Sequence, residues 1–183
     1  KDFGRILIDK FTLWVLDKGN HRVLAFSREN FQVKYIIANG CGKPIDIGTD
    51  GMGYLSVLDK KTHQIHKYSV NGVFIGSFDK PNLESPIGLA IGKENTLYVI
   101  DMKYNKETNK SETWLLKFID QEKKPIPIRK FNEISEEFKP SFISIDKEGN
   151  IFVVDEGTGH IYQFDPDGSY IGNASIPDYK GPI

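Results

Sequence analysis

An aspartate, a histidine and an arginine lie within six positions of each other in the stretch LWVLDKGNHRV, residues 13–23. Taken alone, Asp17, His21 and Arg22 have the residue types of an active site, and an arginine here could bind a phosphate or a carboxylate. However, an apolar run that leads into an aspartate and a short polar segment also fits a strand that ends in a turn. His21 and Arg22 are therefore candidate binding residues whose role depends on the elements that position them.

The aspartate recurs along the chain at a regular spacing. Equivalent apolar runs end at four positions, namely Asp17, Asp59, Asp101 and Asp155. The steps between them are 42, 42 and 54 residues, and the prolines that open other apolar runs repeat with steps of 42, 54 and 42. Two independent markers thus give one period and place the same excess in the third unit. The sequence predicts four repeat units, residues 2–43, 44–85, 86–139 and 140–181, with the start of a further unit at 182–183.

Each unit reads as four short strands. Apolar and polar residues alternate, β-branched and aromatic residues are frequent, and Gly, Asn and Asp mark turns at short intervals. No segment shows a sustained 3.6-residue apolar period. Four-stranded units that repeat at about 40 residues are typical of a β-propeller. We therefore predict an all-β fold with four antiparallel blades in this chain, within a single propeller or part of one.

The first unit also resembles a known family. The stretch GNHRVLAF (residues 19–26) after LWVLD, with the weaker echo THQIHKY (residues 62–68), is similar to the NHL repeat. This resemblance implies propellers most often of six blades. Three interpretations stay open: part of a longer propeller, which we favour, a closed ring of four blades, or an open array that needs additional blades or self-association to cover its edges.

The repeated polar residues favour a structural interpretation. A ring of carboxylates could bind a cation, but an aspartate that ends a strand in every unit is expected to accept local backbone hydrogen bonds. His21 and His63 share one repeat position, near the turn after the second strand. His63 and His66 are three apart on a strand and point to opposite faces, so they cannot bind one metal together. We predict no metal ligands, no catalytic residues and no cofactor.

The excess in the third unit is the better candidate for function, because the repeat does not explain it. Eight of its twelve extra residues fall in the segment 102–114 (MKYNKETNKSETW), and four fall around residues 121–130. The first segment is long, basic and aromatic, and we expect a loop there on a rigid scaffold. Its candidate binding residues are Lys103, Tyr104, Lys106, Lys110 and Trp114.

Composition limits the partner. The chain has 183 residues and a formal net charge of −1, so bulk electrostatic attraction to nucleic acid is not expected. The charge is uneven, +4 over residues 1–43 and −5 over 140–183, which suits an oriented protein partner. No apolar run is long enough to span a membrane. A secreted or cell-surface location is slightly favoured over the cytoplasm.

These observations favour a non-enzymatic binding or scaffold propeller that contacts a protein, or else a glycan, within a larger bacterial surface or phage-tail-like protein. One alternative is a propeller hydrolase or lyase, of the lactonase or amidating-lyase type, with a metal in the central channel. Another is an RNA-binding NHL domain, for which Arg5, Lys10, Lys18 and Arg22 give only a thin basic face. Whether the protein is an enzyme stays open, with a non-enzymatic role preferred.

Overall fold

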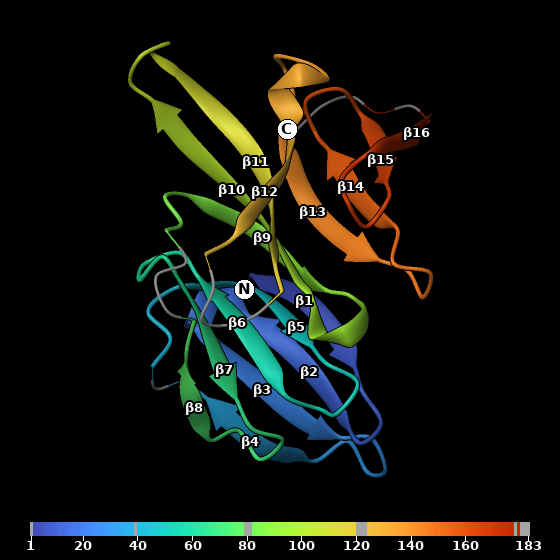
Figure 1. Cartoon of the computed structure of the whole chain (residues 1–183). Helices are drawn as coiled ribbons and strands as arrows, with labels where there is room; N and C mark the ends of the chain where they lie inside the picture. The colour runs from blue at the N-terminus through green and yellow to red at the C-terminus, as the bar shows by residue number, and fades with distance from the viewer. Residues whose placement is uncertain (1, 39, 79–81, 120–123, 178, 180–183) are drawn as a thin grey trace. The chain divides into compact units, whose positions relative to one another are not determined.

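A computed structural model describes residues 2–38, 40–78, 82–119, 124–177 and 179. The strands form four sheets of four, and each sheet is an antiparallel meander of strands consecutive in the chain (Figure 1). The prediction of an all-β chain built from four four-stranded units is confirmed. The predicted start of a further unit at residues 182–183, and residues 121–123 of the second excess segment, lie outside the described residues.

The chain divides into two compact units, which we describe separately. Unit 1, residues 1–82, holds two sheets. The strands of the first sheet are β1 (Phe3–Ile8), β2 (Thr12–Asp17), β3 (Arg22–Ser27) and β4 (Val33–Ile37). Those of the second are β5 (Pro44–Thr49), β6 (Leu55–Asp59), β7 (Gln64–Tyr68) and β8 (Phe74–Ser77). Buried side chains of both sheets form one core, which includes Trp14, Leu16, Val23, Ile47, Leu55, Val57 and Tyr68.

Unit 2, residues 83–183, holds the other two sheets. The third sheet of the chain contains β9 (Pro86–Ile91), β10 (Leu97–Asn105), β11 (Lys110–Phe118) and β12 (Ile126–Lys130). The fourth sheet contains β13 (Pro140–Ile145), β14 (Ile151–Asp155), β15 (His160–Phe164) and β16 (Tyr170–Ser175). Here too the core draws on both sheets, with Tyr98, Ile100, Leu115, Phe131, Phe138, Ile143, Val153 and Phe164 among its members.

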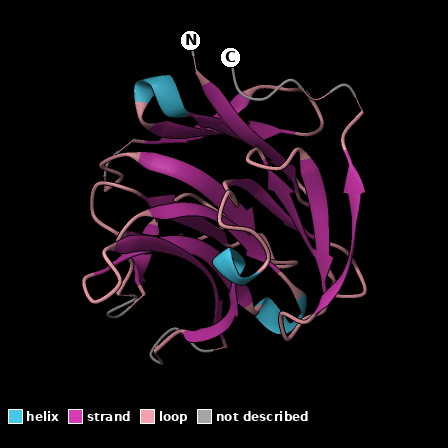
Figure 2. Ribbon diagram, turned by 90° about the horizontal axis from the view of Figure 1, so that it is seen from above, coloured by secondary structure: helices cyan, strands magenta, loops and turns pink. Residues whose placement is uncertain are grey.

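Burial falls from the middle of each sheet to its last strand. Every residue of β6 is buried, whereas β8 and β16 have exposed side chains along most of their length. Alternation along β2 and β14 buries every second residue, as expected where one face of a strand enters a core. Three short 3-10 helices, η1 (Lys18–Asn20), η2 (Lys93–Asn95) and η3 (Phe131–Glu133), lie in connections between strands (Figure 2). No helix within the described ranges is long and apolar enough to cross a membrane.

Candidate functional site

The excess of the third unit lengthens a β-hairpin. β10 and β11 have nine residues each, whereas the corresponding β6 and β7 have five, so the eight extra residues are four in each strand. The paired register continues unbroken from Leu97↔Phe118 to Asn105↔Lys110. Figure 1 shows the two strands running together to a shared turn. The expectation of a loop was therefore wrong, because the inserted residues pair with each other in continuous register across the hairpin.

Part of this hairpin pairs with no other strand among the residues that the structure describes. Pairing with β9 stops at Asp101, and pairing with β12 stops at Trp114. The four residue pairs beyond these positions form a two-stranded extension of the sheet, which we call the hairpin extension: residues 102–105 and 110–113. An isolated two-stranded hairpin is marginally stable in water, so the extension needs further contacts to hold its position.

Neighbouring segments supply those contacts along both edges of the extension. On the β10 edge, the Met102 N–H donates to the Ser85 carbonyl at 3.1 Å, and the Tyr104 N–H donates to Oε2 of Glu84 at 3.2 Å. On the β11 edge, the Thr113 N–H donates to Oδ1 of Asn132 at 2.7 Å. These bonds occupy backbone groups that a free strand edge would offer to another strand. The extension is thus braced on both sides.

The extension separates the predicted binding residues into two sets. Lys103, Lys110 and Trp114 fall on one face, because Lys103 pairs with Glu112 and side chains alternate along a strand. Tyr104 lies on the opposite face, where its hydroxyl donates to Oδ1 of Asn109. Lys106 lies in the turn between the strands.

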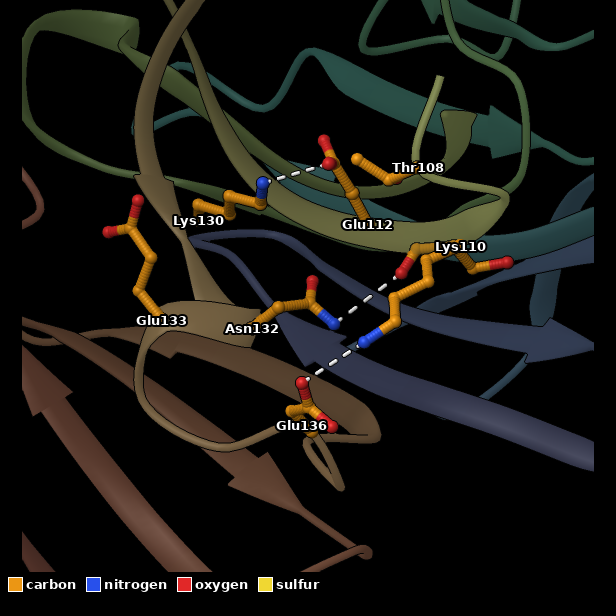
Figure 3. A pocket seen from close by; sticks show the side chains of 8 residues that line it. Thr108, Lys110, Glu112, Lys130, Asn132, Glu133 and Glu136 are labelled. Atoms are coloured by element: carbon orange, nitrogen blue, oxygen red, sulfur yellow. Dashed lines mark hydrogen bonds and ion pairs between the residues drawn. The ribbon is translucent and has the colours of Figure 1, made fainter. Parts of the chain in front are cut away.

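A hollow of about 460 Å³ lies beside the β11 side of the extension. It is lined by Thr108, Lys110, Ser111, Glu112, Lys130, Asn132, Glu133 and Glu136 (Figure 3). The residues after β12 reach it because two stacked aromatic rings, Phe131 and Phe138, anchor that segment in the core with centroids 4.6 Å apart. The polar residues between these anchors are held at the surface.

Two ion pairs cross between the walls of the hollow. Nζ of Lys130 lies 2.8 Å from Oε1 of Glu112, and Nζ of Lys110 lies 3.2 Å from Oε1 of Glu136 (Figure 3). The first pair is largely covered and the second is open to solvent. Within the part of the chain that the structure describes, Glu133 forms no ion pair, so its carboxylate can meet an incoming group.

The Glu112 carboxylate is the most constrained charge of the hollow. A hydrogen bond from Lys130, followed by one from Nδ2 of Asn105 at 2.8 Å, lowers its pKa below the ordinary glutamate value, against the opposing effect of burial. Nζ of Lys130 also lies 5.4 Å from the centre of the Trp114 ring. The Trp114 face is thus shared with a cation, and the hollow offers fixed charges together with hydroxyl and amide groups.

Sequence reasoning missed the wall opposite the hairpin. Lys130, Asn132 and Glu136 contribute most of that wall, and none of them was a candidate. The signal available was the second excess of four residues, placed around residues 121–130. The contribution of Glu112 could have been inferred only by pairing it across the hairpin with Lys103.

His21 and Arg22 belong to unit 1, in the connection between β2 and β3. Nε of Arg22 donates to Oδ2 of Asp17 at 2.8 Å, and Nδ2 of Asn20 donates to the same carboxylate. The Asn20 and Arg22 hydrogen bonds lower the Asp17 pKa. His21 is exposed, with a left-handed φ of 51°. Left-handed residues also end the three equivalent turns: His63, Asn109 and Gly159.

The other repeated aspartates are fully buried and bind backbone N–H groups. Asp59 accepts from Gly42 and Lys43 before β5 and from Lys61 and Thr62 in the next turn. Among the described residues, the backbone donors to Asp101 are Glu84 and Ser85, because the hairpin extension replaces its turn. Asp155 accepts from Lys139, Gly157 and Thr158. Each carboxylate joins the end of a second strand to the start of the first.

Among the described residues, no three or more His, Cys, Asp or Glu side chains are grouped so that they could hold a metal ion. His66 is buried, with Nδ1 2.7 Å from Oγ of Ser77 and Nε2 3.1 Å from Oγ1 of Thr62.

Comparison with models of known protein families and with curated protein sequences gives no match. Solved structures do match. Virginiamycin B lyase from Staphylococcus aureus superimposes with a TM-score of 0.69 at 13% identity, over 94% of this chain and 55% of the lyase. Hydrazine synthase of Kuenenia stuttgartiensis superimposes with a TM-score of 0.67 at 15% identity, over 92% of this chain and 47% of the synthase. A gluconolactonase from Xanthomonas campestris superimposes with a TM-score of 0.53 at 15% identity, over 91% of this chain and 72% of the gluconolactonase.

The chain has a β-propeller fold. Its four meanders are propeller blades, as the repeat period predicts. The chain spans about half the length of the first two of these structures. At such identities the similarity establishes the fold, and the neighbours include propeller lyases and a lactonase.

Proposed function

We propose that this protein is a non-enzymatic binding propeller of the NHL type, which contacts a protein partner through the hairpin extension and the hollow beside it. The observation that carries the proposal is the bracing of the extension. Its outward backbone groups bind Ser85, Glu84 and Asn132, so the surface is formed before any partner arrives. Preformed surfaces avoid the cost of ordering a loop on binding.

The chemistry of the hollow supports a polar partner. Two lysines and three glutamates line it, and the exposed Lys110–Glu136 pair contributes little stability of its own. A partner can therefore exchange with this pair at small cost and gain charge-assisted hydrogen bonds. The same hydroxyl, amide and carboxylate groups also suit a glycan, which is the second class of partner that we expect.

Shortening the hairpin tests this proposal without removing the blade. Deleting residues 102–105 and 110–113 joins Asp101 to Trp114 through the turn 106–109, which has the same length as the turn between β6 and β7. We expect this shortened chain to fold as before. Random peptides displayed on phage, and a printed glycan array, should give ligands that bind the full chain and lose binding to the shortened one.

A matched variant separates the hollow from the hairpin backbone. Lys110→Gln and Glu136→Gln together remove the exposed ion pair and leave the bracing bonds in place. Ligands of the hollow should bind this variant several-fold more weakly. A selection that yields no ligand with weaker binding to the shortened chain than to the full chain would contradict the proposal.

A propeller lyase or lactonase is the second candidate, because proteins with these activities have the same fold. This candidate predicts turnover of quinupristin or of a gluconolactone by the purified chain, measured with and without an added divalent metal. Turnover that persists in the shortened chain would favour this candidate over the binding module.

A further inference from the structure

A second surface, in unit 1, lies at the turns that join first to second strands. The turn between β1 and β2 forms a ridge with a hollow on each side, and Asp9 lines both hollows. The larger, about 450 Å³, is lined by Ile8, Asp9, Lys10, Arg28, Thr49, Asp50 and Gly51. The smaller, about 190 Å³, is lined by Asp9, Phe11, Thr12, Lys34, Met52, Gly53, Val70 and Asn71. We call these residues the ridge surface.

The ridge is rigid. Oδ1 of Asp9 accepts from the Phe11 and Thr12 N–H groups at 2.8 and 2.7 Å, and Oδ2 accepts from Nε1 of the buried Trp14 at 2.7 Å. Nη1 of Arg28 donates to the Asp9 carbonyl at 2.8 Å. The carboxylate is therefore occupied from within the protein, and the turn cannot move without breaking several bonds.

Large apolar side chains are exposed on this rigid ridge. The exposed fractions are 65% for Ile8, 66% for Phe11, 67% for Met52 and 42% for Val70. The equivalent turns of unit 2 carry polar residues instead, Lys93-Glu94-Asn95 and Lys147-Glu148-Gly149. The turns of unit 2 show that this connection can form without exposed apolar residues. The repeat therefore does not explain why Phe11 and Met52 are apolar and exposed. Clustered exposed apolar side chains with polar neighbours mark interaction sites.

The charges of the ridge surface indicate the partner. Lys10, Arg28 and Lys34 form no ion pair with a carboxylate among the residues that the structure describes. The two aspartates of the surface are engaged inward, Asp9 as above and Asp50 by the Met52 and Tyr54 N–H groups at 3.0 and 2.9 Å. Within the described ranges, these three cations therefore lie beside exposed apolar groups without a carboxylate partner.

We propose that the ridge surface binds an acidic protein segment, with one large apolar side chain seated between Phe11, Met52 and Val70 and its carboxylates paired with Lys10, Arg28 and Lys34. The smaller hollow has room for the apolar side chain. Gly53 lines this hollow, and a Cβ added there would contact Val70, so the missing side chain at Gly53 leaves space for the ligand. Paired charges around a desolvated apolar anchor supply both orientation and affinity.

Random seven-residue peptides displayed on phage and selected on the immobilised full chain test this inference. The expected consensus is one large apolar residue flanked by Asp or Glu. A synthetic copy should bind about tenfold or more weakly to Phe11→Ser/Met52→Ser, since that variant loses two apolar contacts. Lys10→Gln/Lys34→Gln should weaken binding several-fold and reduce its dependence on salt. Ile36→Ser, which removes an exposed apolar residue of β4 outside both hollows, should leave binding unchanged.

Three outcomes would overturn the inference. The first is the absence of an acidic apolar consensus, or a consensus peptide that binds Phe11→Ser/Met52→Ser as it binds the natural chain while both melt alike. The second is that no peptide binds but phosphatidylserine vesicles do, and that this vesicle binding requires Phe11 and Met52. That result would identify the ridge surface as a membrane-binding surface. The third is a dimer in sedimentation that the same variant abolishes. The hairpin-shortened chain should keep the peptide, so failure of this inference and failure of the proposed function are distinguishable.

Discussion

Asp59 and Asp101 occupy the same place in their blades, yet their carboxyl pKa values shift in opposite directions. Burial raises both values. At Asp59, hydrogen bonds from Thr62, Lys43, Gly42 and Lys61 outweigh burial and lower the pKa below 3.8. At Asp101, two backbone donors do not outweigh burial, and the pKa is raised. The number of local N–H donors, set by the turn that follows, decides the sign.

These shifts predict opposite dependences of stability on pH. A carboxyl group with a lowered folded-state pKa stabilises the fold above 3.8, and this contribution is lost as the pH falls through the folded-state value. Asp101 has the reverse effect: its contribution declines as the pH rises from 3.8 to its raised value. Asp59→Asn should therefore lower the free energy of unfolding by about 2 kcal/mol at neutral pH, because an amide offers one acceptor oxygen where two are used.

Asp101→Asn should cost less than Asp59→Asn, since Asp101 has two backbone donors where Asp59 has four, and Oδ1 of Asp101 accepts from both Glu84 and Ser85 while Oδ2 accepts only a second contact from Glu84. Urea unfolding at neutral pH and near pH 4 measures both effects. Equal losses in the two variants at neutral pH would contradict this account of the repeated aspartate.

The shared position of His21 and His63 is explained by backbone shape. Both residues are left-handed, and Asn109 and Gly159 take this conformation in the other blades. We expect His21→Gly to change the unfolding free energy by less than about 1 kcal/mol, and His21→Val to lower it by about 1–2 kcal/mol, because a β-branched residue is strained there. Thermal unfolding of the two variants checks this. A large loss with glycine would point to a role for the imidazole itself.

At the scale of elements, the two sheets of unit 1 are joined by a buried ion pair. Nε of Arg5, on β1, lies 2.9 Å from Oδ1 of Asp46, on β5, and both side chains are 8% exposed. Burial lowers the Arg5 pKa, and the nearby Asp46 charge opposes that shift. A buried charge that loses its partner is costly to keep in the protein.

Asp46→Ala should therefore lower the unfolding free energy by about 3–5 kcal/mol. The double variant Arg5→Met/Asp46→Leu should recover most of this loss, since it leaves no uncompensated charge. Urea denaturation of the single and double variants measures the difference. A double variant less stable than Asp46→Ala would show that the pair has further essential contacts.

The hairpin illustrates how far sequence reasoning reaches. The repeat period located the excess to within a few residues, and four extra residues in each strand account for its first part. The alternation that makes this segment a strand is weak, because its side chains are almost all polar. The opposite wall of the hollow depends on two phenylalanines, Phe131 and Phe138, that enter the core and hold the polar residues between them at the surface. No local pattern reveals such an anchor.

For the whole molecule, the sequence predicts the architecture better than the function. The aspartate and proline spacings were sufficient to predict four four-stranded blades, because each blade repeats the same pattern of buried residues and turns. Contacts between blades depend on packing that is not periodic. Arg5 with Asp46 and the ridge surface of unit 1 are two such cases, because the repeat pattern carries no information about residues that differ between blades.

The central claim, that the hairpin extension and its hollow are the binding surface, is tested most directly by nuclear magnetic resonance. Amide shifts of the full chain are recorded with a peptide or glycan selected for dependence on the hairpin. We predict that the largest changes fall in residues 102–113 and 130–136, with little change in the first strand of each blade. Changes concentrated in β1, β5, β9 and β13, with the hairpin unaffected, would contradict the account.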